Sequence, residues 1–228
     1  MKNILAFGDS VLKGIVFENG RYRALSESFS AILEERLNLK TENRGQMGST
    51  VLRLEKAMGR AEKYLGDPEF DTVFLLFGGN DCDYDWQAIS EAPEAEHICK
   101  TPPDIFLQEY TKYIAQLKQM GKEVYLLSLP PIDDEKYFRF ISRGRDSEAI
   151  LSWLGNDKAL LMHWHEMFNL LVFRAGNSAG APVLDISSCF LSRPNYTNYL
   201  CEDGIHPNRE GHRLIADALC ANGIFKNL

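Results

Sequence analysis

Long apolar runs, paired cysteines and an excess of basic residues are all missing from this chain of 228 residues. Without an apolar run of about 20 residues, no segment is expected to span a membrane. The five cysteines are odd in number and lack CxxC spacing, so we interpret them as free thiols of a reducing compartment. A strand predicted from residue 3 leaves no room for a signal peptide, which favours a cytoplasmic location.

The net charge of −7 is also informative, because it argues against nucleic acid as a partner and against stable association with an anionic membrane. No GxGxxG or Walker loop follows the first apolar segment, so no nucleotide or flavin cofactor is expected. No metal is predicted either. His163 and His165 lie two residues apart on a predicted helix and point to different sides, so packing is the favoured interpretation. His97 and His212 are predicted to face solvent.

Apolar segments of strand length alternate with helical patterns along the chain, and 45% of the residues are hydrophobic. This alternation predicts an α/β fold with three α/β/α layers and a five-stranded parallel, flavodoxin-like sheet in the order 2-1-3-4-5. We expect one domain over residues 1–228, with insertions at about 82–103 and 132–150 near the active edge and a loop over residues 11–23. The expected strands are 4–7, 40–43, 71–77, 123–129 and 182–186, and the expected helices are 26–37, 51–65, 104–120, 151–175 (divided at Gly155) and one ending near 220–222.

The first strand ends abruptly in Gly8-Asp9-Ser10. A buried parallel strand that stops there delivers its polar residues to the carboxyl edge of the sheet, where open α/β sheets bind ligands. Ser10 is therefore a candidate nucleophile, although such a tripeptide is also an ordinary turn and helix cap. Asp9 is expected to hold the turn by hydrogen bonds and is not counted as catalytic.

A serine hydroxyl needs a neighbouring base, and histidine suits that task. His206 lies three residues after Asp203 in a tight Gly-containing turn before the last helix, so Asp203 is the candidate orienter. Asp185 is a weaker rival for that role. Oxyanion donors are expected from the Ser10 N–H, the Gly45 N–H and the side chain of Asn80, although Gly45 and Asn80 are also ordinary turn residues.

These four segments resemble the SGNH hydrolase superfamily of GDSL-type lipases and esterases. Its blocks are matched by 7–10, 43–45, 78–81 and 203–207, so the name-giving Ser, Gly, Asn and His fall on Ser10, Gly45, Asn80 and His206. Val11 departs from the leucine that many relatives have after the serine. The resemblance implies a three-layer α/β fold and hydrolysis of esters or thioesters through an acyl-serine, with no metal.

The sequence thus predicts a serine esterase acting on a small-molecule or glycan ester. Three alternatives stay open: a thioesterase or lysophospholipase, a carbohydrate acetylesterase with the same machinery, and a non-catalytic binding module. Five aromatic residues in the later segments are expected to pack, although some could line an acyl or leaving-group pocket: Trp86, Tyr137, Phe138, Phe140 and Trp153. The acyl group, the alcohol, the oligomeric state and any lid function of the two insertions are left undefined by the sequence.

Overall fold

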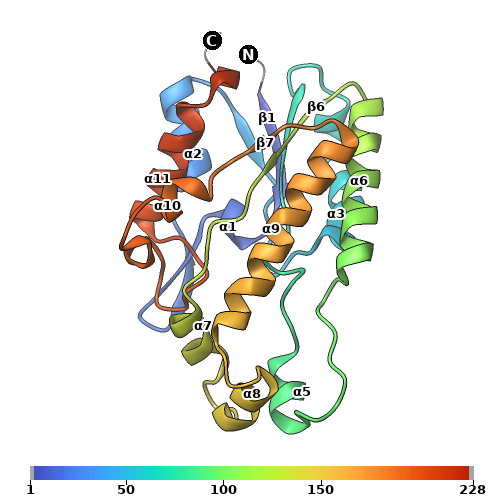
Figure 1. The fold of residues 1–228 in the computed structure, drawn as a ribbon. Coiled ribbons are helices and arrows are strands. Elements are labelled where there is room, and N and C mark those ends of the chain that lie inside the picture. Colours follow the sequence, from blue (N-terminus) through green and yellow to red (C-terminus); the bar gives the residue numbers. More distant parts are fainter. Residues whose placement is uncertain (1–2, 226–228) are drawn as a thin grey trace.

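The computed structural model describes residues 3–225 and is built on a parallel sheet of five strands (Figure 1). These strands are β1 (Ile4–Gly8), β4 (Thr41–Asn43), β5 (Thr72–Leu76), β6 (Glu123–Leu127) and β7 (Val183–Leu184). Their spatial order is β4-β1-β5-β6-β7, and all four pairings are parallel. Counted along the chain within this sheet, the order is 2-1-3-4-5, so the predicted fold class and strand order are confirmed.

The two central strands are buried along their whole length, which explains their continuous apolar sequences. Their register pairs Ile4 with Thr72 and Gly8 with Leu76, so β1 and β5 end side by side. The loops that follow them therefore begin at the same edge of the sheet. β4, at one side of the sheet, has only half-buried residues.

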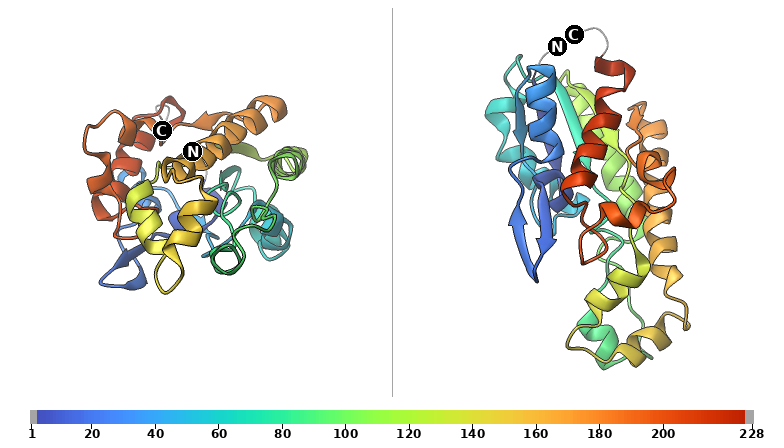
Figure 2. Two further views of the ribbon diagram at one scale, coloured as in Figure 1. Left: turned by 60° about the horizontal axis from the view of Figure 1, so that its bottom comes forward. Right: turned by 90° about the vertical axis from the view of Figure 1, so that its left-hand side faces the viewer.

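Helices cover both faces of the sheet, as Figures 1 and 2 show. On one face, α2 (Phe29–Leu37) packs against α11 (Arg209–Cys220), beside the short α10 (Ser188–Leu191). On the other, α6 (Pro103–Gln119) packs against α9 (Ala159–Ala179), next to the 3₁₀ helix η1 (Val51–Arg53) and α3 (Leu54–Gly59). The remaining short elements are α4 (Glu62–Leu65), η2 (Tyr196–Tyr199) and η3 (Gly223–Phe225). The helix expected over 51–65 is thus three separate pieces.

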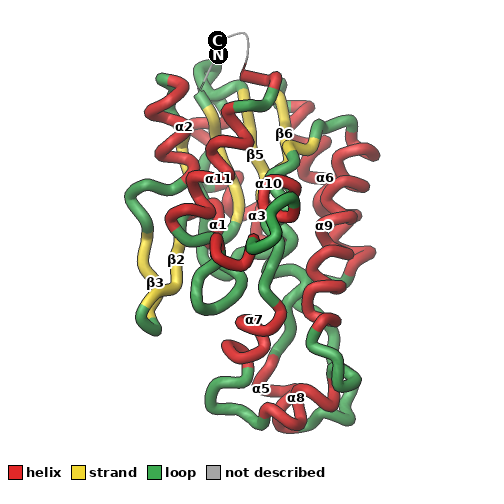
Figure 3. Tube along the Cα trace, turned by 60° about the vertical axis from the view of Figure 1, so that its left-hand side comes forward, coloured by secondary structure: helices red, strands yellow, loops and turns green. Residues whose placement is uncertain are grey.

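The loop expected over residues 11–23 is wrong. This segment forms α1 (Ser10–Lys13) and a two-stranded antiparallel hairpin of β2 (Ile15–Glu18) and β3 (Arg21–Ala24), visible in Figure 3. Asn19 and Gly20 connect the two strands and both have positive φ, 52° and 70°. An Asn-Gly pair with two positive φ angles is the turn that hairpins favour, because its twist matches that of the strands.

The insertions contain more regular structure than expected. Residues 82–103 include α5 (Trp86–Glu91), and residues 132–150 include α7 (Asp134–Ile141) and the start of α8 (Ser147–Trp153). An aspartate caps each of these helices at its N-terminus: Asp85, Asp133 and Asp146 accept hydrogen bonds from backbone N–H groups of the first turn. Gly155, with φ of 63°, separates α8 from α9, as predicted.

We refer to α5, α7, α8 and the first turn of α9 as the accessory lobe, which lies at the bottom of Figure 1. The lobe has a hydrophobic cluster of its own, separate from the main core around the sheet. Trp86 of α5, Phe138 of α7 and Ile150 of α8 are buried in this cluster, and Trp153 packs against it. The lobe therefore holds its shape by apolar burial and stands beyond the carboxyl edge of the sheet.

The solvent-facing position predicted for His212 is wrong, whereas His97 is partly exposed. His212 is completely buried between α11 and α2, where its ring stacks on Phe29 at 5.8 Å and its Nδ1 accepts the Phe29 N–H at 3.4 Å. Burial lowers the pKa of His212 to about 4. His97 is half-buried, with its Nε2 2.8 Å from the Ala92 carbonyl oxygen and its ring edge against Trp153.

The buried His212 predicts a loss of stability in acid. Its pKa is lower in the folded protein than in the unfolded chain, so between about pH 6.5 and 4 the unfolded state binds more protons. The free energy of unfolding should therefore fall by about 3 kcal/mol across this window on account of His212 alone. In His212→Asn, which keeps an acceptor for the Phe29 N–H but does not titrate, this part of the pH dependence should disappear. Urea denaturation of both proteins at pH 7 and pH 4 measures the difference, and equal slopes against pH would contradict the prediction.

Candidate active site

Ser10 stands at the first position of α1, immediately beyond the end of β1, and its side chain is buried. Asp9 caps this helix, with its Oδ1 accepting the Val11 N–H at 2.9 Å. Asp9 thus holds the turn, as the sequence predicts. Because it is the first residue of the helix, Ser10 has an N–H without an intrahelical acceptor, and we find no other acceptor for it within residues 3–225.

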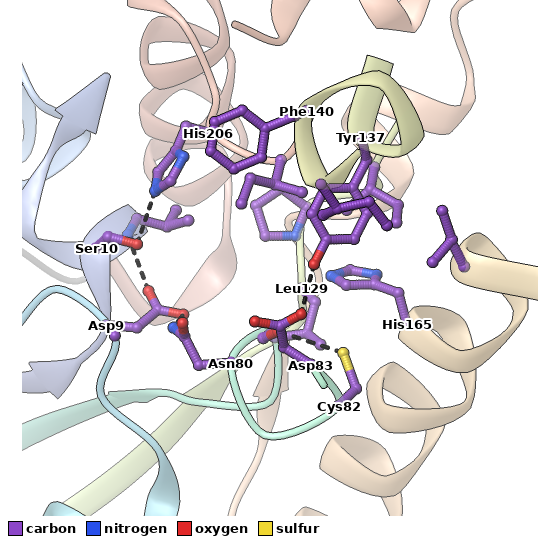
Figure 4. Close-up of a pocket in the computed structure, with 18 of the residues that line it drawn as sticks. Asp9, Ser10, Asn80, Cys82, Asp83, Leu129, Tyr137, Phe140, His165 and His206 are labelled. Atoms are coloured by element: carbon purple, nitrogen blue, oxygen red, sulfur yellow. Dashed lines mark hydrogen bonds between the residues drawn. The ribbon is translucent and has the colours of Figure 1, made fainter. Parts of the chain in front are cut away.

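A continuous set of hydrogen bonds joins Ser10 to the end of the chain. The Nε2 of His206 lies 2.8 Å from Ser10 Oγ, and its Nδ1 lies 2.6 Å from Asp203 Oδ2 (Figure 4). His206 is 4% exposed and Asp203 is fully buried, so both bonds lie in a low-dielectric environment. The structure therefore brings together the three side chains that the sequence singles out.

The Asp203–His206 turn is held by its own hydrogen bonds. Asp203 Oδ1 accepts the N–H groups of Ile205 and His206, both at 3.2 Å, so the carboxylate fixes the backbone as well as the ring. The Cys201 N–H donates to the His206 carbonyl at 2.8 Å. Gly204 has φ of 78° and its carbonyl accepts the Asp133 N–H at 2.8 Å, which connects the turn to the start of α7.

Asn80, in the loop after β5, also reaches the pocket beside Ser10. Its Nδ2 donates to Asp9 Oδ2 at 3.4 Å, so Asp9 orients Asn80 as well as the helix that carries Ser10. One of the two Nδ2 hydrogens is then available to another acceptor. The rival orienter, Asp185, instead caps the turn after β7, where it accepts bonds from Ser128 and from the Ser187 and Ser188 N–H groups.

Gly45 does not fit the role expected of it. Its N–H donates to Asn43 Oδ1 at 2.9 Å, and a side chain there would collide with the backbone at Lys13 and Asp9. It is a close-packing glycine outside the pocket lining. Gly48, three residues later in the same turn, does line the pocket, and we find no acceptor for its N–H in the described part of the chain. The Gly45 N–H is therefore already bonded within its own turn, and Gly48 is the glycine of this turn that faces the pocket.

Two buried carboxyl groups, those of Asp9 and Asp81, belong to the loops that follow β1 and β5. Burial raises the pKa of Asp9 to about 6, although the Val11 N–H and His206 act in the opposite direction. Burial, together with the neighbouring Asp9, raises the pKa of Asp81 to about 7. At pH 7 Asp9 is thus mostly ionised, which suits its role as acceptor from Val11 and Asn80.

A pocket of about 220 Å³ opens from Ser10 and His206 toward the accessory lobe. Of the aromatic residues singled out in the sequence, Trp86, Tyr137 and Phe140 line it, whereas Phe138 and Trp153 pack within the lobe. Apolar residues from several elements complete the wall: Val11, Met47, Leu76, Cys82, Leu129, Ile132, Ile141, Leu161 and Ile205. The pocket is therefore suited to an organic group that is mostly apolar.

Asp83 is the polar residue that closes the lobe side of the pocket. Its Oδ1 accepts the Tyr137 hydroxyl at 2.6 Å and the Trp86 indole N–H at 2.7 Å, and its Oδ2 accepts Lys100 Nζ at 2.6 Å. The loop after β5, α5 and α7 are thus joined by one carboxylate. Sequence reasoning did not single out Asp83, since an aspartate in a polar loop gives no signal of such contacts.

Neither a metal site nor a membrane-spanning helix occurs within residues 3–225. Among the described residues, no group of three or more His, Cys, Asp or Glu side chains has the geometry to hold a metal ion. No helix within residues 3–225 combines the length and apolar character needed to cross a bilayer. His163 is exposed and His165 is buried against the pocket, so the two do not form a chelating pair.

A protein-family model matches most of this chain. The model of the GDSL-like lipase/acylhydrolase family matches residues 6–214. A search of the curated proteins gave no match.

Several solved structures share the fold. A lipase/acylhydrolase from Enterococcus faecalis superimposes with a TM-score of 0.67 at 18% identity, covering 100% of this chain and 97% of its own. LAE5, an alpha/beta hydrolase enzyme from the metagenome of Lake Arreo, has a TM-score of 0.66 at 21% identity, with 96% and 94% covered. A catalytic mutant of Axe2, an acetylxylan esterase from Geobacillus stearothermophilus, has a TM-score of 0.67 at 16% identity, with 96% and 92% covered. At these identities the likeness concerns the fold.

A side chain at Gly204 should destabilise the turn that carries Asp203 and His206. An added Cβ would lie 2.6 Å from the Asp133 carbonyl oxygen and 2.6 Å from the Tyr137 nitrogen, in addition to the strain of positive φ. Gly204→Ala should therefore lower the free energy of unfolding by about 3 kcal/mol or more. Gly155→Ala is the matched control, since Gly155 also has positive φ but open space around it, and it should lose only about 1 kcal/mol. Urea denaturation compares the two; equal losses would show that the contacts of Gly204 are unimportant.

Proposed function

Because the chain belongs to the GDSL-like lipase/acylhydrolase family and is a hydrolase acting on esters, we propose that it is a serine esterase with Ser10 as nucleophile, His206 as base and Asp203 as orienter. The family resemblance inferred from the four sequence blocks is thereby confirmed. The observation that carries the proposal is the set of bonds from Ser10 Oγ through His206 to Asp203, at 2.8 and 2.6 Å.

The first half of the reaction forms an acyl-enzyme. His206 Nε2 takes the Ser10 proton while Oγ attacks the ester carbonyl, and Asp203 keeps Nδ1 protonated and stabilises the imidazolium. His206 then gives the proton to the leaving alcohol. In the second half, His206 activates a water molecule that attacks the acyl group, and the acid and Ser10 are released.

The negative charge on the carbonyl oxygen is stabilised by three donors: the Ser10 N–H, the Gly48 N–H and Asn80 Nδ2. The proposal for the first two is supported by the absence of an acceptor for either N–H in the described part of the chain. Asn80 is supported by its place in the pocket lining and by its bond to Asp9, which fixes the amide before substrate binds.

A carbohydrate acetylesterase is a second candidate function. It is supported by the aromatic lining of the pocket, since aromatic faces stack on sugar rings, and by the likeness to an acetylxylan esterase. A thioesterase or lysophospholipase would use the same machinery on longer chains. p-Nitrophenyl esters of increasing length, acetylated sugars and an acyl-CoA, compared under one set of conditions, distinguish these functions by their rates.

We also propose that the enzyme acts in the cytoplasm. All five cysteines are free, and Cys82, Cys99 and Cys201 are buried, which suits a compartment that keeps thiols reduced.

Ser10→Ala tests the nucleophile. Removing Oγ should abolish hydrolysis of p-nitrophenyl acetate, because no acyl-enzyme can form, whereas the melting temperature should stay nearly unchanged. A fluorophosphonate should label the wild-type protein at Ser10 and leave the variant unlabelled. Turnover by Ser10→Ala at the wild-type rate would refute the assignment.

Asn80→Ala tests the oxyanion donor. We expect kcat to fall about 10²–10³-fold with little change in KM, since the lost hydrogen bond is strongest in the transition state. Asn177→Ala, at an exposed position of α9, is the control and should keep wild-type kinetics. Steady-state kinetics with p-nitrophenyl acetate measures both variants, and a rise in KM alone would assign Asn80 to ground-state binding.

A further inference from the structure

His165 is a buried pocket residue that the proposed reaction does not use. It lies on α9, is 6% exposed and forms part of the pocket wall. Among the buried side-chain nitrogen and oxygen atoms of the described residues lining this pocket, its Nδ1 is the one without a hydrogen bond. Figure 4 shows the ring pointing into the pocket.

Three other polar side chains around the pocket are already bonded. Asp83 accepts three hydrogen bonds, Asp9 is bonded to Val11 and Asn80, and His206 is held by Asp203. A buried polar group that lacks a partner is costly, about 1–3 kcal/mol, unless a ligand or water supplies one. His165 is therefore a buried pocket side chain with unused hydrogen-bonding capacity.

The surroundings of His165 define which nitrogen faces the substrate. Its Nδ1 lies 3.7 Å from Glu166 Oε1, and Glu166 Oε2 accepts the Asn169 side-chain amide at 3.2 Å. Burial raises the pKa of Glu166, but His165 and Asn169 lower it more, and the result is below its usual value. Glu166 Oε1 lies beside Nδ1, so it favours the imidazole tautomer with the proton on Nδ1 over the tautomer with the proton on Nε2. Nε2 is then left as a hydrogen-bond acceptor.

The position of Nε2 relates it to the reacting centre. A methyl group built on the Cα of Gly79 would lie 3.9 Å from His165 Nε2 and 3.7 Å from Asp9 Oδ2. Asp9 is the residue that orients Asn80 and caps the helix of Ser10. His165 therefore faces the pocket close to Gly79, whereas His206 lies on the opposite side in Figure 4.

The reaction geometry assigns this side of the pocket to the acyl group. Of the four substituents of the tetrahedral intermediate, one is Ser10 Oγ, one is the oxyanion and one is the leaving oxygen, which must lie near His206 to be protonated. The fourth, the acyl chain, extends away from His206. In that direction lie His165 and the apolar wall of the accessory lobe, including Trp86 and Tyr137.

We propose that His165 is a specificity-determining residue whose Nε2 accepts a hydrogen bond from a hydroxyl group on the acyl part of the substrate. The substrate class is an ester of a medium-length or aromatic hydroxy acid: apolar enough for the lobe wall, with one hydroxyl that reaches His165. The assignment rests on the proposed function, since it takes Ser10 and His206 as the reacting pair.

The test uses methyl esters in pairs that differ by one hydroxyl: butanoate and 3-hydroxybutanoate, hexanoate and 6-hydroxyhexanoate, 3-phenylpropanoate and 3-(4-hydroxyphenyl)propanoate. Acid release is followed at constant pH, with enzyme-free controls. In the pair whose hydroxyl reaches Nε2, the wild-type enzyme should prefer the hydroxylated ester by about 10-fold or more in kcat/KM. His165→Leu should abolish this preference while changing the rate on the plain ester less than about threefold.

Two further variants separate contact from structure. His165→Gln, which retains an acceptor, should restore part of the preference. His163→Leu, two residues away and exposed, should behave as the wild type. Melting temperatures check that each variant is folded.

The outcomes are distinct. The inference is overturned if no pair is discriminated by the wild type, or if His165→Leu lowers the rates on both members of a pair equally. It is also overturned if the variant instead changes the preference between cyclohexyl acetate and trans-2-hydroxycyclohexyl acetate, because that places His165 on the alcohol side. A Ser10-dependent esterase with no hydroxyl preference leaves the proposed function standing, whereas hydrolysis that persists in Ser10→Ala removes both.

Discussion

The hydrogen bond between Ser10 and His206 joins residues 196 positions apart, and the arrangement of the pocket depends on it. Its two ends are fixed by different means. Ser10 follows β1, a buried strand with a partner on each side, so the sheet determines where the hydroxyl stands. His206 lies in a loop and depends on local bonds, from Asp203 to the backbone and from the Asp133 N–H to the Gly204 carbonyl. Because Asp133 caps α7, the accessory lobe contributes to the position of the His206 imidazole as well as to the pocket wall.

The lobe is itself held against the sheet by a polar contact at its centre. Asp83 follows β5 and accepts bonds from Trp86 of α5 and Tyr137 of α7, while the apolar faces of these helices form a separate cluster. A carboxylate that is bonded on both oxygens specifies one arrangement of its partners, which apolar packing alone does less sharply. The hydrogen bonds to Asp83 also hold the rings of Trp86 and Tyr137 in the pocket wall. The same bonds therefore determine both the shape of the pocket and the attachment of the lobe.

The sequence predicts the sheet and most of the site because both follow from short-range patterns. Buried parallel strands are apolar runs, and their ends are marked by residues such as Gly8-Asp9-Ser10. The hairpin at Asn19-Gly20 has a local signal, because an Asn-Gly pair favours a tight turn between antiparallel strands, although the sequence analysis predicts a loop there. Gly45 and Gly48 cannot be told apart by pattern, since the choice depends on Asn43 accepting the Gly45 N–H. The burial of His212 depends on the packing of α11 against α2, and the local hydrophobic periodicity of the sequence does not indicate this contact.

His165 differs from the other polar residues near Ser10 in what folding requires of it. Asp9 caps a helix, Asp83 joins three segments, and Asp203 fixes a turn, so each would be needed for the structure even without a substrate. An apolar side chain at position 165 would also complete the pocket wall, and the distance of 3.7 Å between His165 Nδ1 and Glu166 Oε1 is longer than a hydrogen bond. Because Nδ1 faces Glu166 and the ring points into the pocket, a hydrogen bond between Nε2 and a bound molecule gives the histidine a role that folding does not require.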